Sequence, residues 1–308
     1  LTQSDKRIWL YQDLPGSSIK NDALRQFFHD VSKHDGVDRY FVTERVGDLS
    51  AKYPAITDNV IAARSSRHKF LFAASDLVIA SYLERNTFIP FTKRGINQLG
   101  DLFRPKKYVY LQHGILHAHI PWYFSKDRVL FDYEVVSTDF EVKNLTQNYC
   151  FDESSLITSG AARLDDLRFG SADFAGKRII YAPSWRSYLV GGKSEARVGD
   201  DDSLLRSHLW RGMKAFLDGV SESGMLERYG YMLDVKLHPN FACYKHLFDY
   251  GSDCIRLAED NVDEGSYAVM VTDFSSMVYD FVYTGARVMY FVPDADEFRN
   301  GFNHYSKL

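Results

Sequence analysis

The chain has little of what marks several common protein classes. It contains three cysteines in 308 residues, Cys150, Cys243 and Cys254, and they are too far apart for a metal-binding motif. An odd and scattered set of cysteines also predicts no disulfide framework, so we expect a reducing compartment. No apolar run approaches the roughly 20 residues that a membrane-spanning helix needs. The first residues do not resemble a signal peptide.

The charge balance and the motif content exclude further classes. With 37 Lys and Arg against 41 Asp and Glu, the formal net charge is −4, whereas nucleic-acid-binding proteins are usually basic. The sequence has neither a glycine-rich dinucleotide fingerprint nor a P-loop. It shows no internal repeat and no low-complexity tract. We therefore expect neither a nucleic-acid-binding protein nor a repeat protein.

What remains is the composition of a globular protein. Hydrophobic residues make up 45% of the chain and charged residues 25%, which is typical of folded domains. A chain of this length is sufficient for two α/β domains of ordinary size. Aromatic residues are abundant, at 15%, and leave room for an aromatic surface that meets a membrane.

Short apolar runs alternate with helix-like segments along the first half. Leu24, Phe27, Phe28 and Val31 follow the i, i+3, i+4, i+7 spacing of an amphipathic helix. The runs that we predict to be strands are Lys6–Gln12, Arg39–Thr43, Val60–Ala62, Leu77–Ser81, Lys107–Leu111, Tyr133–Ser137 and Leu156–Thr158. Such alternation is typical of a parallel sheet covered by helices.

The second half starts the same alternation again. Its predicted strands are Arg178–Ala182, Tyr231–Leu237, Cys254–Leu257, Tyr267–Val271 and Arg287–Val292. One long helix is predicted from about Ser203 to Ser221, and the segment Gly160–Asp165 (GAARLD) joins the halves. We predict an α/β fold of two Rossmann-like domains, residues 1–160 and 161–308, with a cleft between them.

The stretch from Val269 to Thr284 reads VMVTDFSSMVYDFVYT and predicts a strand, a turn and a helix. The first N–H groups of such a helix lack backbone partners and attract anions. Ser275 and Ser276 would add two hydroxyl donors. The alternative is ordinary helix capping, because Asp and Ser are common N-cap residues.

Four polar sites fall at the carboxyl ends of predicted strands, where ligands bind in open α/β sheets. They are His113, Arg186, His238, and Asp273 with Ser275 and Ser276. Each has a plainer explanation, such as a structural histidine, a surface cation or a turn at His238–Pro239. Together they favour chemistry at a phosphate, because a proton-accepting histidine would lie beside a basic cradle.

Two further signals are weaker. The run Asp200–Asp202 has the residue type of a divalent metal site, but we prefer to interpret it as a solvated loop whose last residue, with Ser203, starts the next helix. The basic residues Lys177, Arg178, Arg186, Lys193 and Arg197 predict a phosphate-facing or solvated edge. That cluster is too small for binding duplex nucleic acid.

An ordered set of short motifs resembles a known family. QHG (Gln112–Gly114), GAARLD, APSWR (Ala182–Arg186), KLHP (Lys236–Pro239) and TDFSS (Thr272–Ser276) occur in this order. The set is similar to that of the CDP-glycerol glycerophosphotransferases, which are teichoic-acid primases and polymerases, and of related capsule polymerases. The matches extend from about Arg7 to Phe302.

The resemblance implies a GT-B architecture with the active site between two Rossmann-like domains, residues 161–308 binding the donor. It makes His113 and His238 the catalytic histidines, with His113 as the candidate general base. It places Arg186, His238, Asp273, Ser275 and Ser276 at the donor diphosphate. The motif positions Gly114, Arg163, Ser184, Pro239 and Thr272 have supporting roles.

The resemblance also implies the substrates and the location. The donor would be CDP-glycerol or CDP-ribitol, and the acceptor a lipid-linked or polymeric hydroxyl compound in teichoic-acid or capsule synthesis, with CMP released. A divalent metal is compatible with such phosphoryl transfer but not required. The protein would act at the inner face of the cell membrane. Family members continue through a further helix where this sequence ends at Leu308.

The sequence departs from the family pattern, and other functions stay open. Many teichoic-acid polymerases read HGTPLK, whereas Gly114 is here followed by Ile-Leu-His-Ala. One alternative is a GT-B glycosyltransferase that uses a nucleotide-sugar, and another is a non-catalytic polymer-binding module. For the membrane, one interpretation is contact through His117 to Phe131, where Trp122, Tyr123 and Phe124 lie near Lys126 and Arg128. The alternative, to which we give equal weight, is that these aromatic side chains pack against the first domain.

Overall fold

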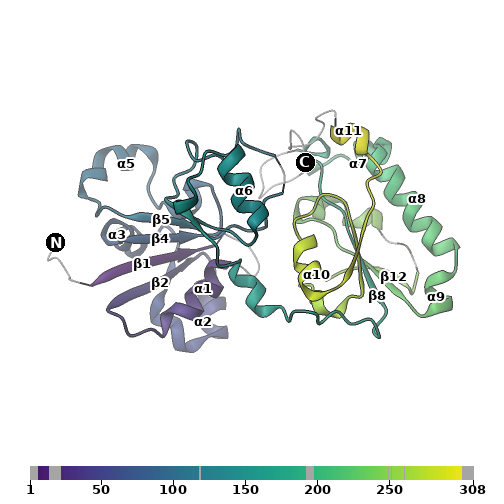
Figure 1. The fold of residues 1–308 in the computed structure, drawn as a ribbon, viewed down its shortest axis with the longest axis horizontal. Helices are drawn as coiled ribbons and strands as arrows, with labels where there is room; N and C mark the ends of the chain where they lie inside the picture. Colours follow the sequence, from purple (N-terminus) through teal and green to yellow (C-terminus); the bar gives the residue numbers. More distant parts are fainter. Residues whose placement is uncertain are drawn as a thin grey trace. The chain divides into compact units, whose positions relative to one another are not determined.

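The structure is a computed structural model that describes residues 6–13, 22–117, 119–191, 198–248, 250, 252–259 and 261–299 (Figure 1). It divides into two compact units. Unit 1 comprises Leu1–Ile115 and Pro121–Asp165, and unit 2 comprises Leu116–Ile120 and Asp166–Leu308. The chain therefore enters unit 2 briefly at Leu116, returns to unit 1 at Pro121, and passes into unit 2 for its remaining length at Asp166.

Unit 1 is built on a seven-stranded sheet in the order β3-β2-β1-β4-β5-β6-β7, with every pair of neighbours parallel. Its strands are β1 (Arg7–Gln12), β2 (Val37–Thr43), β3 (Val60–Ala62), β4 (Leu77–Ala80), β5 (Lys107–Tyr110), β6 (Tyr133–Val135) and β7 (Leu156–Ile157). The strand order reverses between β1 and β4. That reversal is the switch point at which α/β sheets bind ligands.

Helices connect most of these strands, as the alternation in the sequence predicts. They are α1 (Asp22–Val31), α2 (Val46–Lys52), α3 (Ser66–Ala74), α4 (Arg85–Phe88), α5 (Lys93–Leu99) and α6 (Asp139–Asn148), with the 3-10 turns η1 (Pro54–Asn59), η2 (Gly100–Leu102), η3 (Glu153–Ser155) and η4 (Ala162–Asp166). The predicted apolar face of α1 packs in the core, where Leu24 and Phe27 are buried beside Tyr11 and Phe41.

Unit 2 repeats the pattern with five parallel strands in the order β12-β11-β8-β13-β14. The strands are β8 (Arg178–Ala182), β11 (Met232–Val235), β12 (Ile255–Leu257), β13 (Val269–Thr272) and β14 (Arg287–Tyr290). Its switch point lies between β8 and β13. A separate two-stranded antiparallel pair, β9 (Val190–Gly191) with β10 (Val198–Gly199), lies outside this sheet.

The helices of unit 2 are α7 (Asp201–Arg206), α8 (His208–Glu222), α9 (Met225–Tyr229), α10 (Val278–Thr284) and α11 (Ala295–Arg299), with the turns η5 (Ser187–Leu189), η6 (Pro239–Phe248) and η7 (Glu264–Ser266). The single long helix predicted from Ser203 to Ser221 is wrong. Ser207 breaks it, because its hydroxyl accepts the N–H of Trp210 and so caps the start of α8.

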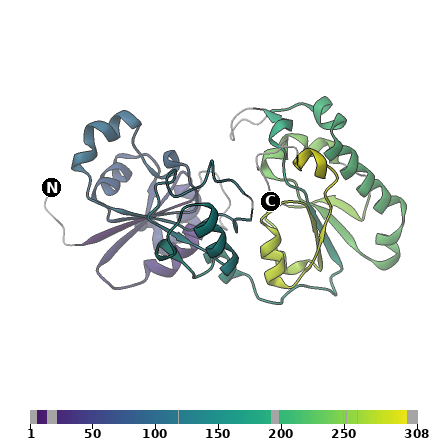
Figure 2. The ribbon, with the colours of Figure 1, turned by 45° about the horizontal axis from the view of Figure 1, so that its top comes forward.

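The sheet of unit 2 has a core on each face. Leu209, Met213 and Leu217 of α8 pack against one face together with Val271, whereas Phe281 of α10 packs against the other face. Figure 2 shows α8 and α10 on opposite sides of this sheet. The predicted α/β class, with a parallel Rossmann-like sheet in each half, is confirmed. In the part of the chain that the structure describes, no helix is both long enough and apolar enough to cross a membrane.

Candidate functional site

The carboxyl ends of β8 and β13 bring two of the predicted motifs together at the switch point of unit 2. The hydroxyl of Thr272, the last residue of β13, donates a hydrogen bond of 2.7 Å to the carbonyl oxygen of Ala182, the last residue of β8. Each strand then leaves the sheet, β8 into Pro183–Arg186 and β13 into Asp273–Ser276. The loops that follow these strands therefore begin side by side.

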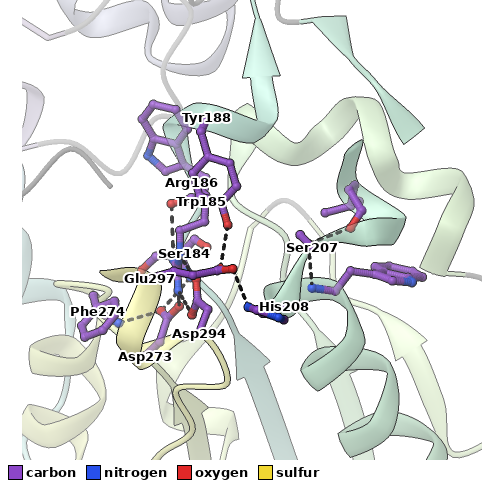
Figure 3. A network of polar contacts seen from close by, with 12 residues as sticks. Ser184, Trp185, Arg186, Tyr188, Ser207, His208, Asp273, Phe274, Asp294 and Glu297 are labelled. Atoms are coloured by element: carbon purple, nitrogen blue, oxygen red, sulfur yellow. Dashed lines mark hydrogen bonds and ion pairs between the residues drawn. The ribbon is translucent and has the colours of Figure 1, made fainter. Parts of the chain in front are cut away.

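The Asp273 carboxylate ties the two loops to each other (Figure 3). Its Oδ1 accepts the backbone N–H of Ser184 at 2.7 Å and that of Phe274 at 2.6 Å, and its Oδ2 accepts the Arg186 guanidinium at 2.8 Å. Asp273 is buried. It does not cap α10, which begins at Val278, so the capping alternative fails for this residue.

Arg186 lies fully buried between two carboxylates. Its Nε and Nη2 donate to Asp294 at 2.7 and 2.8 Å, Nη2 also donates to Asp273, and Nη1 donates to the carbonyl oxygen of Ser184 at 3.0 Å. Burial alone would lower the pKa of Arg186, but its hydrogen bonds to Asp294 and the charges of both carboxylates raise it. The side chain that was expected at the donor diphosphate thus faces protein acceptors, which favours a positioning role.

The turn after Asp273 presents polar groups that remain available for a ligand. The Ser275 hydroxyl oxygen accepts the N–H of Met277 at 3.3 Å, and the backbone N–H groups of Ser275 and Ser276 have no partner within the described residues. Both serines are half-buried. This edge of unit 2 therefore offers two N–H groups and two hydroxyls in consecutive residues.

His238 joins the same edge from the end of β11. Its Nδ1 accepts the backbone N–H of Asn240 at 3.1 Å, so the neutral ring carries its proton on Nε2. The imidazole stacks on Trp185, with ring centroids 5.9 Å apart and planes inclined by 25°. Pro239 follows as the first residue of η6. Three strand ends of unit 2 thus contribute predicted site residues to one edge of its sheet.

His113 lies in unit 1, just after β5. The preceding Gln112 adopts a left-handed backbone conformation (φ 64°), and its buried side-chain amide donates to Glu134 at 2.9 Å and to the carbonyl of Val135 at 3.0 Å. The His113 ring stacks on Tyr82, with centroids 4.7 Å apart and planes inclined by 5°. Its Nδ1 lies 3.0 Å from the hydroxyl oxygen of Tyr110. Gly114 follows and is half-buried.

The environment of His113 favours the neutral imidazole. The side chain reaches the surface, but surrounding protein atoms displace much of its water, and this desolvation lowers its pKa. The charge of Glu84 and a backbone hydrogen bond with Ser81 act in the opposite direction. A histidine whose pKa lies below its usual value is unprotonated near neutral pH and can accept a proton.

The switch point of unit 1 holds a group of residues that the sequence analysis missed. Asp13 accepts the backbone N–H groups of Ala23 and Leu24 and the hydroxyl of Ser81, which follows β4. Burial raises the pKa of Asp13 to about 6. Asp22 is buried and accepts both the backbone N–H (2.7 Å) and the Nη1 (3.0 Å) of Arg163. Arg163, the arginine of the GAARLD segment, therefore holds the first residue of α1 in place.

The other sequence signals do not form sites. Within the described residues, no group of three or more His, Cys, Asp or Glu is arranged to hold a metal ion. Asp201 and Asp202 begin α7, as the helix-start alternative predicted. Arg178 lies at the opposite end of β8 from Arg186 and binds Asp234, so the basic residues do not form one edge. Lys193 and Arg197 lie outside the described residues.

Arg178, Asp234 and Arg256 line a polar cavity of about 360 Å³ in unit 2. Asp234 accepts hydrogen bonds from both arginines, at 2.5 Å from Arg178 and at 2.6 Å from Arg256. Both arginines already pair with the same buried carboxylate. The polar lining of this cavity is therefore an ion-pair network within the fold.

The expected membrane-facing segment is only partly exposed. Trp122 and Tyr123 are exposed, but Phe124 is buried beside Tyr110 and Phe151. The ammonium of Lys126 donates to the carbonyl oxygen of Phe131 at 2.6 Å, so it secures a loop. The interpretation of Phe124 as an interfacial residue is therefore wrong, because its ring completes the aromatic core of unit 1.

Comparison with known proteins gives one family and several related proteins. The model of the family described as CDP-glycerol:poly(glycerophosphate) glycerophosphotransferase matches residues 3–307. The minor teichoic acid biosynthesis protein GgaB of Bacillus subtilis (strain 168) is 25% identical over 315 residues, which cover 98% of this chain and 34% of GgaB. The chain thus spans about a third of the length of this curated relative.

Solved structures share the fold at low sequence identity. A variant of the wall teichoic acid polymerase TagF matches with a TM-score of 0.60 at 14% identity, covering 98% of this chain and 74% of that one. The UDP-GlcNAc 2-epimerase from Neisseria meningitidis, bound to UDP-GlcNAc, matches with a TM-score of 0.56 at 12% identity, covering 94% and 84%. These likenesses confirm the predicted GT-B-like fold class.

Proposed function

Since the chain belongs to the CDP-glycerol:poly(glycerophosphate) glycerophosphotransferase family, we propose that it transfers a polyol phosphate from a CDP-activated donor to a hydroxyl of an acceptor. Glycerol phosphate is the first choice of transferred group. The acceptor would be a lipid-linked or polymeric compound of teichoic-acid or capsule synthesis, and CMP would be released.

The observation that carries this proposal is the turn at Ser275 and Ser276 in unit 2. It lies at the switch point of a parallel sheet, where such folds bind nucleotides. Its two N–H groups, which have no partner in the part of the chain that the structure describes, and its hydroxyls suit the oxygens of a diphosphate, because charge-assisted hydrogen bonds are stronger than neutral ones. We assign the donor diphosphate to this turn, with His238 at the neighbouring strand end.

In this proposal Arg186 and Asp273 position the turn, and the donor does not contact the guanidinium. One cation lies between two buried carboxylates, Asp273 and Asp294, so the formal charge of this cluster is −1. Such a cluster has no net attraction for a diphosphate. Its contribution is to fix the backbone of Ser184 and Phe274, so that the donor-facing groups are held in place before the donor arrives.

His113 is the proposed general base. As the acceptor hydroxyl oxygen bonds to the phosphorus that carries the polyol, its proton passes to the neutral imidazole. The bond between that phosphorus and the bridging oxygen breaks, and CMP leaves with the electron pair. Tyr82 and Tyr110 hold the ring through stacking and the contact at Nδ1, so little reorganisation is needed when the proton moves.

The direct test is CMP release with defined substrates. The full protein is incubated with an acceptor preparation and, separately, with CDP-glycerol, CDP-ribitol and a set of UDP-sugars. Release of CMP together with growth of the acceptor supports the proposal and identifies the polyol. Release of UDP from a nucleotide-sugar would instead establish a glycosyltransferase, and donor binding without turnover would indicate a polymer-binding module.

A membrane-bound acceptor requires the protein to reach the lipid surface, and we propose that unit 1 makes this contact at the inner face of the membrane. Trp122 is 45% exposed, and Arg128 is exposed nearby in the sequence. An exposed Trp beside a cation suits the headgroup layer. Replacing Trp122 by Ser should reduce sedimentation with vesicles of anionic phospholipid, and unchanged sedimentation would remove this contact.

A further inference from the structure

The short segment Leu116–Ile120 belongs to unit 2, although the residues before and after it belong to unit 1. It begins three residues after His113 and contains part of the sequence in which the chain departs from the family motif. Within unit 2, its residue His117 contacts the turn that we assign to the donor and the helix α10 that follows it. The segment therefore joins the loop of the candidate base to the donor turn through the covalent chain.

His117 makes the central contact of this segment. Its Nε2 lies 3.1 Å from the carbonyl oxygen of Phe274. A carbonyl oxygen can only accept a hydrogen bond, so Nε2 must carry the proton and donate it. The imidazole also lies against Tyr279 of α10, with ring centroids 5.8 Å apart. The side chain thus meets both the turn and the helix that follows the turn.

The hydrogen bond from His117 holds the backbone carbonyl group of Phe274. The N–H of Phe274 is already held by the Asp273 carboxylate at 2.6 Å. Its carbonyl group shares a peptide plane with the N–H of Ser275. In a trans peptide these two groups point in opposite directions. When His117 holds the carbonyl, it therefore also sets the direction of the Ser275 N–H.

We propose that His117 is a positioning residue for the donor, acting through the Phe274–Ser275 peptide. This inference rests on the proposed function, because it assigns a task to the turn that we expect to hold the donor diphosphate. Without the contact, the peptide can rotate and the Ser275 N–H loses its fixed direction. Donor affinity then falls. Proton transfer at His113 continues, because the side-chain contacts of His113 are unchanged.

The test uses a matched pair of variants in the full protein. The side-chain amide of Gln reaches the position of Nε2, whereas that of Asn is one methylene shorter and reaches only the position of Nδ1. We expect His117→Asn to raise the dissociation constant for CDP-glycerol roughly 3- to 10-fold, as the loss of one hydrogen bond predicts. His117→Gln should restore it to within about twofold. His34→Ala, at an exposed histidine, is the control.

Calorimetry with CDP-glycerol gives the affinities, and steady-state CMP release separates KM for the donor from kcat. The inference is supported when His117→Asn raises the donor KM with little change in kcat and His117→Gln reverses the effect. Equal affinities for His117→Asn and the unmodified protein overturn the inference alone. Failure of the unmodified protein to bind either CDP-glycerol or CDP-ribitol overturns the proposed function, and the inference with it.

Discussion

The Arg186 guanidinium and the Asp273 carboxylate form a buried ion pair of 2.8 Å that joins the ends of β8 and β13. Asp294 completes the pair from the segment after β14, at 2.7 Å from Nε of Arg186. Together the two carboxylates accept hydrogen bonds from Nε and Nη2 of a guanidinium that is almost completely buried. Asp273 of this pair also accepts the backbone N–H groups of Ser184 and Phe274. The pair therefore links the stability of unit 2 to the geometry of its candidate site.

Replacing Arg186 by Ala should destabilise unit 2 strongly. The change leaves two buried carboxylates without a cation, and breaking a buried pair in this way typically costs about 3–5 kcal/mol. Urea denaturation of the full protein measures the loss. Arg206→Ala is the matched control, because Arg206 pairs with Asp202 at an exposed site, 3.7 Å apart, where a pair contributes at most about 1 kcal/mol. Equal losses for the two variants would contradict a structural role for Arg186.

Replacing His113 by Ala should slow the reaction without weakening donor binding. Loss of a general base typically lowers turnover by roughly two to four orders of magnitude. The rate of CMP release and the calorimetric affinity for CDP-glycerol separate the two effects. Near-normal turnover in this variant would remove the assignment.

The pH dependence of the unmodified protein tests the same assignment. A general base acts in its neutral form, so the rate rises with pH through the pKa of His113. Because desolvation lowers that pKa, the rise should be centred below the usual value of about 6.5. His113→Ala should lose this limb of the profile. A rise centred well above pH 7 would point to another group.

Much of the fold follows from the sequence alone. Every predicted strand is present with its bounds shifted by a few residues, because apolar runs between turn residues are local signals. The strand ends carry His113, Arg186, His238 and Asp273, as expected from the same runs. Parallel sheets bring carboxyl ends to one edge, so the grouping of the last three in unit 2 was predictable.

Long-range partners were not predictable from the same signals. Nothing in the APSWR motif shows that Arg186 pairs with Asp294, which lies 108 residues further along the chain. An arginine that binds a ligand and one that balances buried carboxylates have the same local sequence. Likewise Phe124 has the neighbours of an interfacial residue, and only its packing against Tyr110 and Phe151 shows that it is buried. Burial depends on elements that are distant in sequence.

A double variant at the two serines of the donor turn tests whether these residues bind the donor or cap the helix. Replacing both Ser275 and Ser276 by Ala should weaken CDP-glycerol binding by on the order of 1–3 kcal/mol, the contribution of two charge-assisted hydrogen bonds. Folding should suffer less, because Asp273 and the backbone of the turn keep their contacts. Calorimetry gives the affinity of this variant for CDP-glycerol, and a thermal melt gives its melting temperature. Ser154→Ala, at an exposed serine, is the control. A lower melting temperature with unchanged affinity would favour capping.

The stability of unit 1 should depend on pH through Asp13. Burial raises the pKa of Asp13 in the folded protein to about 6, whereas an unfolded Asp titrates near 3.9. The folded state therefore binds the proton more tightly. The stabilisation is fully present below about pH 4 and is lost as the pH rises to about 6, by on the order of 1–3 kcal/mol. Asp13→Asn cannot titrate, so its free energy of unfolding should fall less over this range than that of the unmodified protein.

Asp35 supplies a control of the opposite sign in the same unit. Its two carboxylate oxygens accept hydrogen bonds from Arg39 at 2.8 and 2.6 Å, and this pairing lowers the pKa of Asp35 to about 2. Its contribution is present above about pH 4 and is lost as the pH falls toward 2. Asp35→Asn should therefore differ from the unmodified protein at neutral pH and converge with it in acid. If Asp13→Asn instead followed that same course, the carboxyl of Asp13 would be ionised and stabilising in the folded state, contrary to the burial that raises its pKa.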